Sequence, residues 1–166
     1  MPTTLAAREQ QIWDWLSAIS DPEVPVLSIL DLGIVRGVEI GEEGGVTVRI
    51  TPTYSGCPAM DVIAMQIRMA LMSRGIRSLK IEQQLSPAWT TDWMTEEGKR
   101  KLHEYGIAPP QYSSNRAKGL FEEDEVPCPR CLSTHTQVLS DFGSTSCKAQ
   151  YQCLDCKEPF EHFKCH

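Results

Sequence analysis

Two C-x-x-C pairs near the end of the chain place the strongest constraint on its fold. Cys128-Pro-Arg-Cys131 and Cys153-Leu-Asp-Cys156 are separated by 21 residues, close to the spacing of four-cysteine zinc sites. Each pair turns tightly enough for two thiolates to reach one ion, and the residues between them can form a hairpin that closes the tetrahedron. Because a segment this short has few large apolar residues, it needs such a metal to fold. The spacing predicts a small C-terminal β zinc ribbon with structural Zn²⁺ bound by these four cysteines.

The residues alone leave other uses of the cysteines open. A thioredoxin-like redox pair wants one C-x-x-C beside a βαβ unit, and a permanent iron–sulfur cluster also takes four thiolates. Six of the seven cysteines fall between Cys128 and Cys165, which in a reducing cytoplasm indicates metal rather than disulfides. Cys147 and Cys165 lie outside the tetrad. Each is either a packing or terminal residue, or an extra ligand at a second thiolate site.

Charge and composition narrow the kinds of partner. The net charge of -6 comes from residues 1–125, whereas residues 126–166 hold four basic and four acidic side chains. Since no basic stripe is visible, we expect no nucleic-acid partner, and a neutral ribbon favours docking to proteins. The ribbon has four aromatic residues for such docking or for its core: Phe142, Tyr151, Phe160 and Phe163. No signal peptide or run of roughly 18 apolar residues is found, so the expected location is the cytoplasm and no membrane partner is expected.

The residues before the ribbon read as alternating helices and strands. A helical pattern stops at Asp21-Pro22, and two strand-like runs flank the turn sequence GEEGG. The order α-β-β-α-β-α predicts an α+β fold, a small three-stranded sheet with helices on one face. The second helix, residues 58–74, has apolar residues on more than one face and is expected to be largely buried. The helical segments are 8–23, 58–74 and 90–107, and the strands lie within 32–53 and 78–87.

Composition also divides the chain into domains. Residues 108–126 are rich in Pro, Ser and acidic residues, as in a tether. We therefore predict a first domain over residues 1–107, a linker over 108–126 and the ribbon over 127–166.

Cys57 stands apart from the other cysteines, in the stretch PTYSGCPAM. Because Pro58 suits the first position of a helix, Cys57 should lie at or just before the N-cap, with free backbone N–H groups directed at its sulfur. The helix dipole would then lower the thiol pKa and favour a thiolate that attacks electrophiles or binds iron. Thr53, Tyr54 and Ser55 supply hydroxyl groups to the same loop. The alternative is a small buried residue without chemistry.

Several motifs, in one order, resemble the MIP18 family, whose members assist iron–sulfur cluster assembly and transfer. DPEVPVLSILDLGIV is followed by the expected hairpin, then by TPTYSGCPAM and SPAW. With PAWTTDWMTEEGKRKLHEYGIAPP and the cysteine-rich end, about residues 10–166 also resemble the family of phenylacetate-degradation protein D, which is encoded with the bacterial phenylacetyl-CoA epoxidase complex. The resemblance implies a MIP18-like domain followed by a zinc ribbon.

The resemblance further implies an accessory role, the maturation of a metal-dependent epoxidase by delivery of an iron–sulfur cluster to its reductase component. Cys57 then corresponds to the cluster ligand of the family, with Asp21 and Thr53 as neighbours. Because one cysteine cannot hold a 4Fe–4S cluster, the other ligands must come from a second chain in a homodimer, from small thiols, or from Cys147 and Cys165. Such a labile, transient cluster suits a carrier.

Two further functions compete with this one. The first is that of a non-catalytic, stoichiometric subunit that docks the epoxidase components. A thiol-dependent hydrolase that uses Cys57 is the weakest hypothesis, because all four histidines fall at or after position 103. We therefore expect the protein not to be an enzyme itself.

Overall fold

The computed structural model describes residues 4–111 and 125–164 of the 166-residue chain. The chain folds into two compact units, Met1–Trp89 and Thr90–His166, and we describe each by itself. Both units contain helices and strands, which confirms the mixed α+β class. In the part of the chain that the structure describes, no helix combines the length and apolar character that a membrane span requires.

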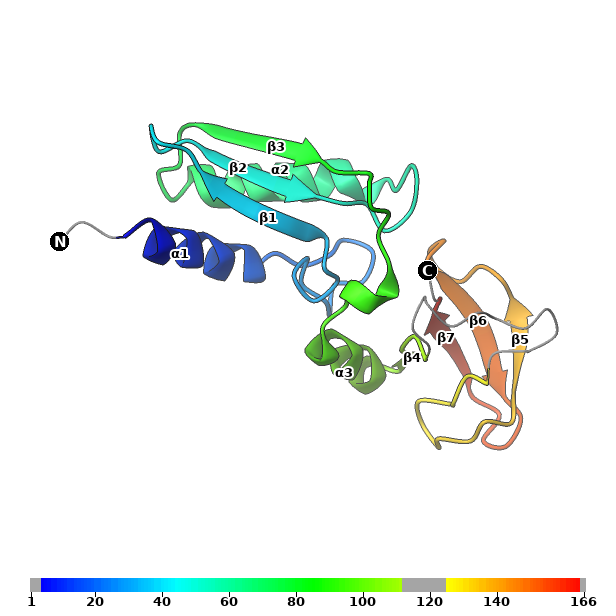
Figure 1. Ribbon diagram of the computed structural model, residues 1–166. Coiled ribbons are helices and arrows are strands. Elements are labelled where there is room, and N and C mark those ends of the chain that lie inside the picture. The colour runs from blue at the N-terminus through cyan, green and yellow to red at the C-terminus, as the bar shows by residue number, and fades with distance from the viewer. Residues whose placement is uncertain (1–3, 112–124, 165–166) are drawn as a thin grey trace. The chain divides into compact units, whose positions relative to one another are not determined.

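The first unit is a three-stranded sheet with two helices (Figure 1). The strand order is β1-β2-β3, with β1 and β2 antiparallel and β2 and β3 parallel. The β1-β2 hairpin confirms the interpretation of GEEGG, and its turn uses Gly44 at φ 78°, a conformation that glycine adopts without strain. The elements are α1 (Leu5–Ser17), β1 (Val35–Ile40), β2 (Val46–Ile50), α2 (Ala59–Met72) and β3 (Leu79–Gln83).

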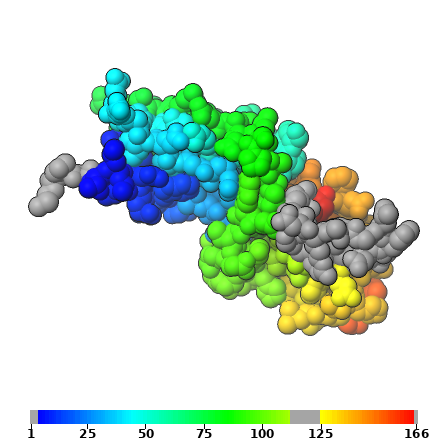
Figure 2. Space-filling model, in the orientation of Figure 1, coloured from blue at the N-terminus to red at the C-terminus, as the bar shows by residue number. Residues whose placement is uncertain are grey.

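The core of this unit lies between one sheet face and the two helices, as Figure 1 shows for α2. Space-filling atoms of α1 and of the cyan hairpin meet without a gap (Figure 2). Apolar and polar side chains alternate along the strands because the other face of the sheet is polar. On that face the Arg49 guanidinium lies 2.8 Å from Glu39 and 3.5 Å from Glu82, both on neighbouring strands. The largest fully buried side chains of this unit are Ile12, Leu16, Leu27, Ile29, Leu32, Ile34, Ile50, Ile63, Ile67 and Leu71.

The long connection between α1 and β1 is ordered by polar contacts. Ser28 and Asp31 bond each other reciprocally: the Ser28 N–H donates to Asp31 Oδ2 at 2.9 Å, and the Asp31 N–H donates to Ser28 Oγ at 3.0 Å. Trp89, the last residue of SPAW, is buried and donates its indole N–H to the Leu32 carbonyl at 2.7 Å. These bonds satisfy buried polar groups and hold the connection against the sheet.

The second unit carries a four-stranded sheet in the order β4-β7-β6-β5. Strands β5, β6 and β7 are antiparallel neighbours, while β4 adds a parallel edge beside β7. The elements are η1 (Thr91–Trp93), α3 (Glu96–Tyr105), β4 (Ile107–Ala108), β5 (Thr136–Ser140), β6 (Lys148–Cys153) and β7 (Pro159–Phe163).

This division differs from the predicted domain boundaries of 1–107, 108–126 and 127–166. The boundary between the two units falls between Trp89 and Thr90, so α3 belongs to the second unit and not to the three-stranded sheet. Ala108 pairs with β7, and it shares an apolar cluster with Val126, which the prediction assigns to the end of the linker. Residues 112–124 of that predicted linker lie outside the described residues.

The expectation for the second helix is partly wrong. One face of α2 is buried as predicted, but the opposite face exposes four large apolar side chains, Val62, Met65, Met69 and Met72, by 44–67%. The sequence pattern does not separate the two cases, because an apolar residue at the surface and one in the core look alike in a single sequence.

Candidate metal centre and thiol site

Four cysteine sulfurs converge in the second unit. The Sγ atoms of Cys128, Cys131, Cys153 and Cys156 all lie within 4.8 Å of one another. Cys128 Sγ is 3.7 Å from Cys156 Sγ, and Cys131 Sγ is 3.5 Å from Cys153 Sγ. A tetrahedral site with Zn–S bonds of about 2.3 Å requires sulfurs roughly 3.8 Å apart, so the arrangement fits an S4 metal site.

Two tight turns bring the sulfurs together. In the first, the Cys128 N–H bonds the Ser133 carbonyl at 2.9 Å, and Leu132 takes a left-handed conformation with φ 62°. In the second, Cys153 ends β6 and its N–H bonds the Glu158 carbonyl at 3.0 Å, with Lys157 at φ 65°. Each turn directs one buried and one exposed cysteine toward the same point. Strands β5 and β6 connect the two turns, and they pair as the hairpin that the spacing predicts.

Backbone donors and thiol crowding act in opposite directions on these cysteines. The Cys156 N–H is the main cause that lowers the pKa of Cys153 to about 7. A backbone hydrogen bond from Glu158 lowers the pKa of Cys156, but desolvation and the contact with Cys153 outweigh it and raise that pKa to about 12. Four thiolates so close together need a cation to offset their repulsion, which is what a divalent metal supplies.

Other candidate ligands lie apart from this group. Among the described residues, the side chains close enough to share a metal ion in this unit are the four cysteines. Cys147 is buried just before β6, at the opposite end of that strand from Cys153, with Thr145 Oγ1 3.0 Å from its sulfur. His135 Nδ1 instead pairs with Asp155 at 3.0 Å, and His162 Nδ1 lies 3.1 Å from the Ala108 carbonyl. Cys165 lies outside the described residues.

Cys57 comes just before Pro58, the N-cap residue of α2, as predicted. The loop is closed by a bond from the Cys57 N–H to the Tyr54 carbonyl at 3.2 Å, and the Cys57 carbonyl accepts the Met60 N–H at 3.3 Å. Gly56 takes φ 75° and would have nothing within 4 Å of an added Cβ, so only its backbone conformation calls for glycine. The thiol is therefore held in one place at the start of the helix.

The expected direction of the Cys57 pKa is wrong. Burial is the main cause that raises this pKa above the ordinary value of a thiol, and the negative charge of Glu23 adds to it. The Ala59 backbone N–H and the Tyr54 and Thr53 hydroxyls act as donors toward the thiol and lower its pKa, but they do not outweigh burial. The donors that the sequence predicts are present, yet the thiol keeps its proton at neutral pH.

The two acidic residues of the DPE motif, Asp21 and Glu23, have different contacts. Asp21 is buried, and its Oδ1 accepts the N–H groups of Glu23 at 2.9 Å and of Val24 at 2.7 Å. The Tyr54 hydroxyl donates to Glu23 Oε1 at 3.4 Å. Asp21 thus shapes the turn, whereas Glu23 is the carboxylate that acts on Cys57. Sequence reasoning missed Glu23, although it is the third residue of the DPE motif.

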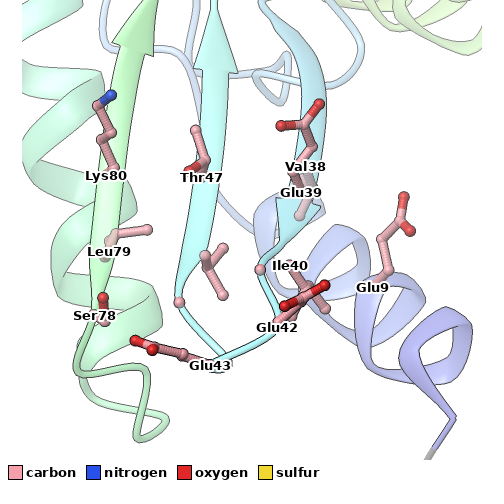
Figure 3. A pocket seen from close by; sticks show the side chains of 13 residues that line it. Glu9, Val38, Glu39, Ile40, Glu42, Glu43, Thr47, Ser78, Leu79 and Lys80 are labelled. Carbon is pink, nitrogen blue, oxygen red and sulfur yellow. The ribbon is translucent and has the colours of Figure 1, made fainter.

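A broad, open hollow of about 1020 Å³ lies at the other end of the sheet (Figure 3). Figure 3 shows acidic side chains there from α1 and from the β1-β2 turn, beside the start of β3. It includes Val46 at the start of β2, whereas the Cys57 loop follows the far end of that strand. The hollow therefore does not adjoin the thiol.

These features define a class: an α+β iron–sulfur assembly domain joined to a four-cysteine ribbon. The family model described as "Iron-sulfur cluster assembly protein" matches residues 9–80. The model described as "PaaD zinc beta ribbon domain" matches residues 113–164. The first match contains the Cys57 loop, and the second contains all four converging cysteines.

The family follows from a full-length relative. The chain is 49% identical over 165 residues to an Escherichia coli protein named as a subunit of a 1,2-phenylacetyl-CoA epoxidase, covering 99% of this chain and 98% of that protein. The chain belongs to the family of this epoxidase subunit, whose ribbon is the PaaD ribbon matched above.

Other relatives match a shorter part of the chain. The chain is 39% identical over 95 residues to an "Fe-S protein maturation auxiliary factor" of Porphyromonas gingivalis, covering 57% of this chain and 90% of the relative. A crystal structure of a DUF59 domain from Bacillus anthracis matches with a TM-score of 0.55 and 25% identity, covering 58% of this chain and 92% of that one. The three-stranded fold is thus that of the DUF59 domains, which confirms the MIP18-like fold expected from the sequence.

Proposed function

We propose that this protein is a cytoplasmic accessory factor of the phenylacetyl-CoA epoxidase system, which acts in aerobic phenylacetate catabolism. Its task is to assemble an iron–sulfur cluster and transfer it to the reductase component. Cys57 is the cluster ligand in this proposal, and Zn²⁺ in the four-cysteine ribbon is structural. The cluster is cargo, so the protein carries it and catalyses no step of the epoxidation.

The observation that best supports this proposal is the set of hydrogen-bond donors around Cys57. The Ala59 N–H and the hydroxyls of Thr53 and Tyr54 lie close enough to lower the pKa of its thiol, in a domain shared with named iron–sulfur maturation factors. Donors of this kind favour the thiolate that iron binds.

The raised pKa suits a carrier that is empty for part of its cycle. The protonated thiol reacts slowly with oxidants and electrophiles, because the thiolate is the reactive form. When iron binds, its positive charge displaces the thiol proton to solvent and an Fe–S bond replaces the S–H bond. The Glu23 carboxylate adds negative charge that favours a cationic cargo nearby.

A single cysteine leaves the cluster incompletely ligated, and this makes the cargo easy to release. A 4Fe–4S cluster ordinarily takes four protein thiolates. In this proposal the remaining ligands come from a second copy of the chain, from small thiols or from Cys147 and Cys165. Labile ligation favours transfer and disfavours permanent electron transport.

Metal analysis after anaerobic purification tests both metal assignments at once. We expect about one zinc per chain, together with iron that varies between preparations and absorbs in the visible range. Cys57→Ser should lose the iron and keep the zinc. Retention of iron by Cys57→Ser would remove this residue from the proposed ligand set.

A second function is favoured by one specific observation, the naming of the E. coli relative as a subunit. A non-catalytic, stoichiometric subunit would remain bound to the epoxidase components after purification, whereas a maturation factor would be recovered in substoichiometric amounts. Co-purification stoichiometry distinguishes the two. The raised pKa of Cys57 argues against a thiol-dependent hydrolase, since such an enzyme needs an activated nucleophile.

A further inference from the structure

The outward face of α2 carries an apolar stripe formed by Val62, Met65, Met69 and Met72. These side chains are 44%, 61%, 67% and 56% exposed, respectively. Their spacing of three, four and three residues is that of the a and d positions of a coiled-coil seam, so they lie in one row along the helix. The row runs on the side opposite the buried residues Ile63, Ile67 and Leu71.

The other two helices show that this chain normally solvates its outward helix faces. The exposed residues in the middle of α1 are polar, among them Gln10 and Asp14, which bond each other at 3.1 Å. On α3, Lys99 pairs with Glu96 and Arg100 pairs with Glu97 and Glu104. A helix that is apolar on both faces is typical of a helix covered on both faces. The stripe on α2 is thus an exception, and it indicates that a partner covers this face of the helix.

The size of the stripe argues against a stable dimer of this chain. Fully burying a Val or Met side chain removes roughly 60–120 Å² of apolar surface from water. Four side chains that are 44–67% exposed then offer roughly 140–270 Å² per chain, or roughly 270–550 Å² for a symmetric pair. Stable interfaces bury about 1,200 Å² or more, so contact through this stripe alone is transient.

The chemistry of the stripe and its place in the fold indicate what covers it. Three of the four residues are methionines, whose flexible, polarizable side chains adapt to differently shaped apolar surfaces. The helix that bears them begins two residues after Cys57. A partner helix laid along α2 would therefore have its end beside the Cys57 loop.

We propose that the α2 stripe is the transient docking site for an amphipathic helix of the protein that receives the iron–sulfur cluster. The partner helix presents its own row of apolar side chains, spaced three and four residues apart, to Val62, Met65, Met69 and Met72. This inference rests on the proposed transfer function for the identity of the partner, the apo form of the reductase component. Docking on α2 holds that acceptor next to Cys57 without using the thiol for binding.

Binding of the full-length, zinc-loaded protein to the purified apo-reductase tests this proposal. The double variant M65Q/M69Q keeps side-chain length and helix propensity, and both sites are exposed, so the fold should be unaffected. We expect its dissociation constant to rise about tenfold or more. L5Q is the matched control, because Leu5 is 66% exposed at the start of α1, outside the stripe, and it should bind as the wild type does.

Methionine oxidation by tert-butyl hydroperoxide, measured by mass spectrometry, locates the contact directly. In the free protein Met65, Met69 and Met72 should oxidise quickly, while Met60 on the same helix, only 4% exposed, should not. Adding apo-reductase should slow oxidation at Met65 and Met69 at least severalfold. Slow oxidation of the stripe in the free protein at all concentrations would mean that the chain covers it itself, and slowing with protein concentration alone would mean self-association. Either result would overturn the proposal.

The comparison with Cys57→Ser separates this inference from the proposed function. This variant should bind the apo-reductase normally but fail to deliver iron. Equal binding by the wild type and M65Q/M69Q, or absence of binding by the wild type, would overturn docking on α2. Full iron delivery by Cys57→Ser would instead overturn the role of the thiol and leave the docking site intact.

Discussion

The Tyr54 hydroxyl donates a hydrogen bond to the Glu23 carboxylate across 3.4 Å, and so joins the Cys57 loop to the turn formed by the DPE motif. Tyr54 belongs to the loop that holds Cys57, and its hydroxyl lowers the pKa of that thiol, whereas the charge of Glu23 raises it. The contact therefore holds an acid that raises the thiol pKa beside the Cys57 loop. This link makes the ionisation of Cys57 depend on a residue far away in the sequence.

Removing the Glu23 charge should lower the pKa of Cys57. In Glu23→Gln the carboxylate no longer opposes the thiolate, so at a given pH below the pKa a larger fraction of Cys57 is ionised. We expect alkylation of Cys57 by iodoacetamide at pH 7.5 to be faster than in the wild type, since the rate below the pKa follows the fraction of thiolate. Peptide mass spectrometry follows this cysteine separately from the others. Unchanged or slower alkylation would show that Glu23 does not act on the thiol.

In the wild type, the pH dependence of Cys57 alkylation should be displaced upward. Because the folded pKa lies above the ordinary value of a thiol, the rate should level off at a higher pH than for an exposed cysteine. The same peptide alkylated in denaturant provides the control, and it should reach its plateau at lower pH. A plateau near pH 8 in the folded protein would restore the activated thiolate that the helix start predicts.

Cys131→Ser should release the zinc and unfold the ribbon. Residues 126–166 depend on the metal for stability, whereas the core of Met1–Trp89 is formed by its own sheet and helices. We expect less than about one-tenth of the wild-type zinc, with the amide resonances of the first unit unchanged in NMR spectra. Cys147→Ser is the matched control and should retain its zinc. A Cys131→Ser protein with one tightly held zinc and an intact ribbon would refute the S4 assignment.

Asp21→Ala should destabilise the first unit by about 2–3 kcal/mol, because the buried N–H groups of Glu23 and Val24 lose their acceptor. Chemical denaturation monitored by tryptophan fluorescence measures this as a lower midpoint with an unchanged slope. Asp14→Ala is the control, since Asp14 is exposed and its loss should change stability by less than about 0.5 kcal/mol. If both variants unfold at the same denaturant concentration, Asp21 does not hold the turn.

Local spacing in the sequence determined the convergence of the four cysteines and the position of the thiol. Two C-x-x-C turns and a hairpin are short-range features, so the convergence of Cys128, Cys131, Cys153 and Cys156 followed from their positions in the chain. The GEEGG sequence predicted the β1-β2 turn for the same reason. Pro58 predicted the start of α2, and this placed Cys57 just before the helix.

Only the tertiary structure decided what surrounds these groups. The Cys57 pKa rises because burial and the charge of Glu23 outweigh the helix start, and both effects come from packing between distant segments. The parallel pairing of β4 with β7 joins Ala108 to the ribbon for a similar reason, since two residues carry too short a pattern to predict a strand. Which side of α2 faces the core also depends on where the sheet lies. A sequence records that Met65 and Ile67 are both apolar, but desolvation is a property of the folded neighbourhood, and it differs between them.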